Sequence, residues 1–116
     1  MSHPVVHFEV IGKDHAKLTA FYGDVFGWKL KAMEGMPYSL IEKEGEGIGG
    51  GIGAAPDGSA GHVTFYVSSM DPQATVDKAV AAGGSVAMPM TDLGMVKVGL
   101  IADPEGHVVG IVDGRE

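Results

Sequence analysis

The chain has 116 residues, of which 45% are apolar and 20% are charged, a composition typical of a globular protein of one domain. Its formal charge is -7 and its eight Lys and Arg residues are scattered, which argues against binding to nucleic-acid phosphates. No apolar run approaches the roughly 20 residues that span a bilayer, and we expect no signal segment because the first residues lack a charged-then-apolar pattern. The absence of cysteine excludes disulfides, thiolate metal sites and a Cys nucleophile, and it fits a cytoplasmic location.

The first half of the chain predicts a strand, a helix and three further strands. Residues 5–11 alternate as a strand does, with His7, Glu9 and Ile11 on one face. Asp14 is the expected N-cap of a helix that Gly27 ends. The expected buried stripe of this helix consists of Leu18, Phe21, Tyr22, Val25 and Phe26. The three strands that follow are expected at 28–33, 38–43 and 47–54.

The second half predicts the same order of elements. A strand runs from His62 to about Val67, and Asp71 with Pro72 supplies the start of a helix that Gly83 and Gly84 close. The expected buried stripe of this helix consists of Val76, Ala79 and Val80. Three more strands are expected at 85–88, 96–102 and 108–112, with a tight turn at 103–106.

The two halves thus repeat with a period of roughly 55 residues, as duplicated units do. The repeat predicts an α+β fold in which two βαβββ modules form a curved mixed-sheet cleft. We expect one domain over residues 1–116, with the first module at about 4–55 and the second at about 61–113.

His7 and His62 lie early in the first strand of their halves, and we expect them at matching places of the repeat. Two neutral imidazoles in one pocket can be half of a metal site, polar anchors of a ligand pocket, or structural residues. Glu9 shares the face of His7, so it is a candidate general base or a further metal ligand. Thr64 and Tyr66 share the face of His62 and are candidates to orient a polar ligand.

Other notable residues carry weaker expectations. The glycine-rich segment 45–61 has no following lysine or helix, so it predicts a curved strand and a connecting loop and not a phosphate-binding loop. The methionines Met88, Met90 and Met95 suit either the rim of a ligand pocket or a dimer contact. Three histidines are expected to be exposed and without function: His3, His15 and His107.

Three segments together resemble the vicinal oxygen chelate superfamily, which includes glyoxalase I, bleomycin resistance proteins and extradiol dioxygenases. They are Phe21–Leu30 (FYGDVFGWKL), Gly61–Val63 (GHV) and Asp103–His107 (DPEGH), in the right order and spacing over almost the whole chain. Within the superfamily, the chain most resembles short bacterial glyoxalase-like proteins.

The resemblance implies four places for metal ligands, at the first and last strand of each half. His7 matches the first and His62 the third. The second and fourth, normally carboxylates, fall in the stretch around Gly50 and on Gly110, where no side chain can coordinate. The implied quartet is therefore reduced to two histidines.

Three functions follow as hypotheses. The first is a glyoxalase-like or bleomycin-resistance-like protein that binds or sequesters a small molecule in its cleft, without the standard metal centre. The second is a metal-dependent lyase, isomerase or dioxygenase with His7 and His62 as ligands of Zn, Ni, Mn or Fe. The third is a metal-free acid/base enzyme that uses Glu9. The expected partners are a small-molecule ligand and a second copy of the chain, with no nucleic acid and no membrane.

Overall fold

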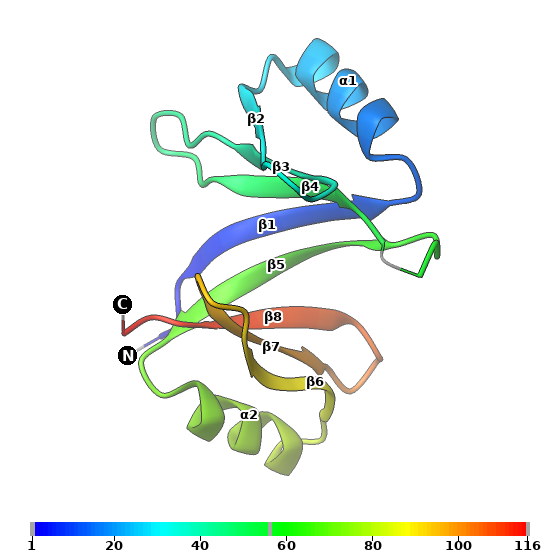
Figure 1. Ribbon diagram of the computed structural model, residues 1–116. Helices are drawn as coiled ribbons and strands as arrows, with labels where there is room; N and C mark the ends of the chain where they lie inside the picture. The colour runs from blue at the N-terminus through cyan, green and yellow to red at the C-terminus, as the bar shows by residue number, and fades with distance from the viewer. Residues whose placement is uncertain (1, 56, 116) are drawn as a thin grey trace. The chain divides into compact units, whose positions relative to one another are not determined.

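The computed structural model describes residues 2–55 and 57–115, so the domain expected over 1–116 is described apart from its two ends and residue 56. It is a mixed α+β structure with two helices and eight strands in the order of two βαβββ modules, as the sequence predicted (Figure 1). The chain divides into two compact units, which we call unit 2 (7–63) and unit 1 (2–6 with 64–115). The cleft expected between the modules stays a prediction.

Unit 2 contains a four-stranded mixed sheet in the order β2-β3-β4-β1. Strand β1 pairs parallel with β4, whereas β3 pairs antiparallel with both β2 and β4. The elements of this module are β1 (Val5–Gly12), α1 (His15–Phe26), β2 (Leu30–Ala32), β3 (Tyr38–Ile41) and β4 (Gly50–Ala54).

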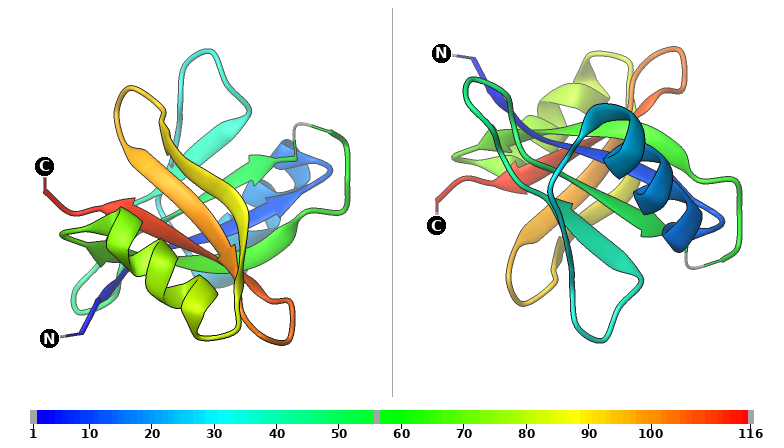
Figure 2. Two further views of the ribbon diagram at one scale, coloured as in Figure 1. Left: turned by 90° about the horizontal axis from the view of Figure 1, so that it is seen from below. Right: turned by 90° about the horizontal axis from the view of Figure 1, so that it is seen from above.

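The core of unit 2 lies between this sheet and α1, which crosses one face of it (Figure 2). Val10, Ile41 and Ile52 are buried there, each on a different strand. The partly buried side chains packed against them are Phe8, Leu18, Tyr22, Trp28 and Leu30. Alternation along β1 therefore sends Phe8 and Val10 to the helix side, and His7 and Glu9 to the opposite face.

Unit 1 repeats this arrangement with a sheet in the order β5-β8-β7-β6. Strand β5 pairs parallel with β8, and β7 pairs antiparallel with both of its neighbours. Val76, Val98 and Ile111 are buried in this unit. Its elements are β5 (His62–Ser69), α2 (Pro72–Ala81), β6 (Ser85–Asp92), β7 (Lys97–Ala102) and β8 (Val108–Asp113).

Both helices start at an aspartate that caps the backbone. The Asp14 carboxylate accepts a hydrogen bond from the Lys17 N–H at 3.0 Å, and the Asp71 carboxylate accepts one from the Ala74 N–H at 3.2 Å. Helix α1 ends at Gly27, which has a positive φ of 70° and donates its N–H to the Gly23 carbonyl. These predicted helix boundaries are confirmed.

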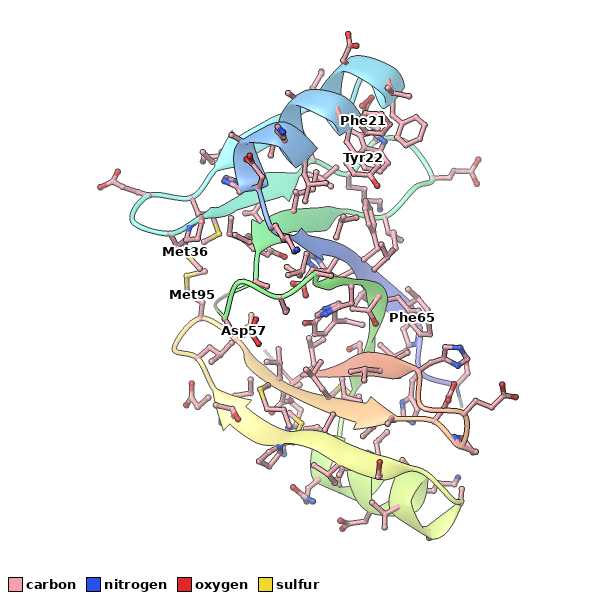
Figure 3. All side chains as sticks on the ribbon, turned by 90° about the vertical axis from the view of Figure 1, so that its right-hand side faces the viewer. Phe21, Tyr22, Met36, Asp57, Phe65 and Met95 are labelled. Carbon is pink, nitrogen blue, oxygen red and sulfur yellow. The ribbon has the colours of Figure 1, made fainter. Side chains whose placement is uncertain are left out.

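The predicted burial of α1 is wrong for most of its stripe. Phe21, Val25 and Phe26 are more than half exposed, because only Leu18 and Tyr22 of this helix face the core. Phe21 instead packs edge-on against Tyr22, with ring centroids 5.1 Å apart (Figure 3). In α2, Val76 is buried as predicted, whereas Val80 is 49% exposed.

The strands differ from the prediction mainly at their ends. Strand β2 is shorter than the predicted 28–33, and β6 extends from Ser85 to Asp92, well beyond the predicted 85–88. No helix within the described residues is long and apolar enough to cross a membrane.

The strand register also corrects the equivalence expected between His7 and His62. Glu9 pairs with Gly51, next to the fully buried Ile52, and Tyr66 pairs with Gly110, next to the fully buried Ile111. Glu9 and Tyr66 therefore occupy equivalent places in the repeat. By the same register, Thr64 is the counterpart of His7, and Val5 is that of His62. A shift by two residues keeps the face of a strand, so alternation alone could not reveal it.

Candidate functional site

The candidate site is a cluster of four polar side chains in unit 2, on the sheet face opposite α1. His7 and Glu9 come from β1, Tyr38 comes from β3, and His62 begins β5. The sequence predicted that His7, Glu9 and His62 would come together, and the structure groups them around one carboxylate. We call these four residues the Glu9 cluster.

The Glu9 carboxylate joins the cluster through both of its oxygens. The Tyr38 hydroxyl donates a hydrogen bond to Glu9 Oε2 at 2.9 Å, and His7 Nε2 lies 3.1 Å from the same hydroxyl. On the other side, His62 Nε2 lies 3.6 Å from Glu9 Oε1. The Glu9 side chain is only 13% exposed, whereas that of His62 is 41% exposed, so the carboxylate is the inner member of this pair.

The protonation of His7 follows from its surroundings. Burial lowers the pKa of His7 below its ordinary value, and the negative charge of Glu9 offsets part of that effect. His7 is therefore neutral near pH 7, with one nitrogen that donates and one that accepts.

Tyr38 reaches the cluster because β4 has no side chains in its path. Tyr38 pairs with Gly53 and Glu9 pairs with Gly51, so the phenol must cross β4 diagonally to reach β1. A Cβ atom on Gly51 would overlap the Tyr38 hydroxyl, and one on Gly53 would lie 2.6 Å from the Tyr38 ring. Both glycines thus make room for the phenol.

Tyr38 was not predicted as a site residue, because in the sequence it only begins a predicted strand. The available signal was the alternation of glycines at 49, 51 and 53, which leaves one face of a strand bare beside a strand that begins with tyrosine. A bare face next to an aromatic residue predicts that the ring lies across it.

A hollow of about 490 Å³ adjoins the cluster at His7. Its charged lining residues are Lys29 just before β2, Lys31 in β2 and Glu42 just after β3. The remaining lining is apolar or glycine: Leu30, Leu40, Ile41, Gly49 and Gly50. The size fits a small organic molecule, and the mixture of apolar walls with a few polar groups is common in ligand sites.

Thr64 and Tyr66, the other two predicted site residues, belong to unit 1. Thr64 is buried, and its hydroxyl donates a hydrogen bond to the Val108 carbonyl at 2.6 Å. This hydroxyl hydrogen therefore links β5 to the start of β8. The Tyr66 ring lies over Gly110, where an added Cβ would overlap it. Gly110 therefore seats an aromatic ring on the neighbouring strand.

The metal centre that the resemblance implies does not fit the donors at these positions. Among the described residues, no group of three or more His, Asp or Glu side chains is arranged to hold a metal ion. A divalent transition metal in a protein prefers at least three protein ligands. The two implied carboxylate positions are occupied by glycines, and the space of their side chains is taken by Tyr38 and Tyr66.

The three histidines expected to lack function differ in their surroundings. His3 is exposed as predicted, and His107 is exposed and paired with Asp103 at 3.0 Å. The expectation that His15 is exposed is wrong, because its Nε2 lies 2.8 Å from the hydroxyl of the buried Ser39. This contact ties the start of α1 to β3.

Comparisons with known proteins agree with this architecture. A sequence model of the Glyoxalase/Bleomycin resistance protein/Dioxygenase superfamily matches residues 5–111. The protein named "Putative glyoxylase CFP32" from Mycobacterium bovis is 32% identical over 106 residues, as is the protein of that name from Mycobacterium tuberculosis. The match covers 84% of this chain but only 41% of each relative, so the chain spans about two fifths of their length.

Solved structures share the fold at low sequence identity. Methylmalonyl-CoA epimerase from Mycobacterium tuberculosis is 14% identical with a TM-score of 0.71, over 97% of this chain and 88% of that one. A superfamily member from Vibrio splendidus 12B01 is 18% identical with a TM-score of 0.65, over 97% and 99% of the two chains. With the family match over nearly its whole length, the chain belongs to the Glyoxalase/Bleomycin resistance protein/Dioxygenase superfamily.

Proposed function

We propose that the Glu9 cluster and the hollow beside His7 bind a small polar molecule, and that the protein binds or sequesters this molecule without a resident metal. The observation that carries the proposal is the continuous contact from His7 through Tyr38 to Glu9 at the edge of a hollow of about 490 Å³. A sheltered carboxylate held by neighbours offers a fixed polar anchor, and the apolar lining offers area to bury.

A screen of small molecules by thermal denaturation, followed by far-UV circular dichroism, tests this proposal. We expect at least one compound to raise the melting temperature of the wild type and not that of Glu9→Gln, which keeps the shape and removes the charge. Glu46→Gln is the matched control, because Glu46 is an exposed carboxylate in a turn of the same unit. A compound that stabilises the wild type and Glu9→Gln equally would place its site elsewhere.

Metal content separates this proposal from the metal-dependent alternative. Elemental mass spectrometry would be applied to tag-free protein purified without chelator and then titrated with zinc, nickel, manganese and ferrous iron. The proposal predicts no metal above background. Near-stoichiometric metal that is lost in the His7→Ala, His62→Ala double variant would contradict it and support the lyase, isomerase or dioxygenase hypothesis, with these histidines as ligands.

The acid/base hypothesis remains a second candidate, because one specific contact favours it. Glu9 is largely shielded from solvent and receives the Tyr38 hydroxyl at 2.9 Å, which is how a catalytic carboxylate can be held for proton transfer. In that case, a compound from the screen would exchange a carbon-bound hydrogen for deuterium in D₂O. Wild type would catalyse the exchange, and Glu9→Gln would not.

We also propose a homodimer that works in the cytoplasm. Two exposed apolar side chains near the β6–β7 connection, Leu93 and Met95, support a contact surface there. Size-exclusion chromatography with light scattering checks the dimer. A Met95→Lys variant should shift the equilibrium toward the monomer, and an unchanged dimer would move the contact elsewhere.

A further inference from the structure

We infer that Tyr38 is the positioning residue of the Glu9 cluster: its single hydroxyl selects which nitrogen of His7 carries the hydrogen and fixes the Glu9 carboxylate. The inference deepens the proposed function and rests on it for its meaning, since these are the polar groups that a ligand would meet. Nothing in the residue pattern of the superfamily resemblance assigns a role to this tyrosine.

The inference follows from the hydrogen bonds among Tyr38, Glu9 and His7. The one hydroxyl hydrogen of Tyr38 is donated to Glu9 Oε2 at 2.9 Å. His7 Nε2 lies 3.1 Å from the same hydroxyl oxygen, which has only lone pairs left to offer. Nε2 must therefore carry a hydrogen and donate it, which makes Nδ1 of neutral His7 the acceptor nitrogen.

The contact with Tyr38 favours one arrangement of the His7 ring. The Tyr38 oxygen can accept a hydrogen from Nε2, whereas it would repel a lone pair there, so the contact at 3.1 Å favours the tautomer with a hydrogen on Nε2.

The backbone holds Tyr38 in place for this role. Its carbonyl accepts a hydrogen bond from the Met33 N–H at 2.8 Å, and its own N–H donates to the Met36 carbonyl at 2.9 Å. The ring then lies over Gly53 and the hydroxyl over Gly51, so the phenol crosses β4 in contact with the sheet. A ring seated in this way has little freedom to swing away from Glu9.

The consequence for the site is a carboxylate of fixed orientation. Tyr38 holds Oε2, and Oε1 lies 3.6 Å from His62 Nε2. A ligand that approaches the cluster thus meets an oriented carboxylate and an imidazole of defined tautomer, and it need not order either group on binding.

The test compares wild type with Tyr38→Phe by long-range ¹H–¹⁵N NMR of the histidine rings at pH 8, on ligand-free protein. Tyr38→Phe keeps the ring over the glycines and removes only the hydroxyl, so the fold should persist. In wild type, we expect His7 to show the pattern of a hydrogen on Nε2 alone. In Tyr38→Phe, the two ring-nitrogen shifts of His7 should move toward each other, as they do when tautomers mix.

The His7→Gln variant assigns the signals, and His107 serves as the internal control because it contacts Asp103 in unit 1. A hydrogen on Nδ1 of His7 in wild type would overturn the inference, and so would His7 shifts that are identical in both proteins. The result does not depend on any ligand. A tautomer change without any stabilising compound in the screen would defeat the proposed function and leave the role of Tyr38 intact, and the reverse result would do the opposite.

Discussion

The paired strands β1/β4 of unit 2 and β5/β8 of unit 1 are equivalent in the repeat but present different chemistry. In unit 2, Glu9 lies opposite Gly51, and the ring above the glycine comes from Tyr38 on β3. In unit 1, Tyr66 lies opposite Gly110, and Tyr66 itself covers that glycine. Each unit therefore places a tyrosine over a glycine, but only unit 2 has a carboxylate beside it.

Gly51 and Gly110 therefore do more than lack the side chains of metal ligands: each makes room for a tyrosine ring. When a glycine faces a tyrosine on a neighbouring strand, the ring covers the glycine and fills the space that a side chain would otherwise occupy. In unit 2 the tyrosine comes from the far side of the glycine, so position 9 is available for a carboxylate. In unit 1 the tyrosine takes that position itself.

The largest effect that tests this comparison is expected from valine at either glycine. Gly51→Val and Gly110→Val should each lower the free energy of unfolding by about 1–3 kcal/mol, because the new side chain would overlap Tyr38 or Tyr66. Urea denaturation followed by circular dichroism measures the loss.

Second-site variants identify the cause of that loss. Tyr38→Ala should compensate part of the loss in Gly51→Val but none of that in Gly110→Val, and Tyr66→Ala should show the reverse preference. Ala32→Val on β2 is the control, because Ala32 is an exposed strand residue. Exposed glycines such as Gly35 and Gly58 are unsuitable controls because both have a positive φ, which strains any other residue. Equal compensation at both glycines would refute the pairing.

The two helices provide the next comparison. Val76 of α2 is 3% exposed and Val25 of α1 is 53% exposed, although both were expected in buried stripes. Val76→Ala should cost about 1–2 kcal/mol through lost apolar burial, whereas Val25→Ala should stay within about 0.5 kcal/mol of wild type. Differential scanning calorimetry measures both, and equal losses would mean that α1 is more deeply packed than its exposure indicates.

Thr64, the counterpart of His7 in the repeat, should matter for stability alone. Thr64→Val removes the hydroxyl that donates to the Val108 carbonyl at 2.6 Å and keeps the shape of the side chain, so it should cost about 1 kcal/mol. Binding of any compound found in the screen should change less than twofold, as measured by isothermal titration calorimetry. A large loss of affinity would mean that Thr64 belongs to the ligand site, as the strand pattern predicts.

The smallest effect concerns His7 and pH. Its pKa in the folded protein lies below the ordinary value of 6.5, so the unfolded chain takes up a proton first as the pH falls. The contribution of His7 to stability is complete above pH 6.5 and is lost as the pH falls through the folded pKa. Urea denaturation at a series of pH values should show a shallower decline in His7→Gln than in wild type. His107→Gln is the matched control, and it should not reproduce that change.

Much of the fold follows from the sequence because its signals are local. Asp14 and Asp71 predict the starts of the two helices, and Gly27 predicts the end of the first. The repeated order of elements predicts the two βαβββ modules. The burial of α1 did not follow, because helical spacing marks an apolar stripe without revealing how much of it the sheet can cover. Phe21 and Phe26 lie at the margin of that stripe and stay exposed.

The site was predictable only in part, for a similar reason. Alternation placed His7 and Glu9 on one face, and the repeat of the two halves indicated His62. The role of Tyr38 depends on a diagonal register across β4, which pairs residues 29 positions apart in the chain with a hydrogen bond. The expected equivalence of His7 and His62 failed on register as well, since a shift by two residues changes no face.

The single tryptophan has a practical consequence for any study of this protein. Trp28 stacks on Tyr22 with ring centroids 5.4 Å apart and packs against the core of unit 2. Since unit 1 has no tryptophan, intrinsic fluorescence excited at the red edge of the absorption band reports the unfolding of unit 2 alone. Comparison of that signal with a probe of the whole backbone would show whether the two halves melt together or one before the other.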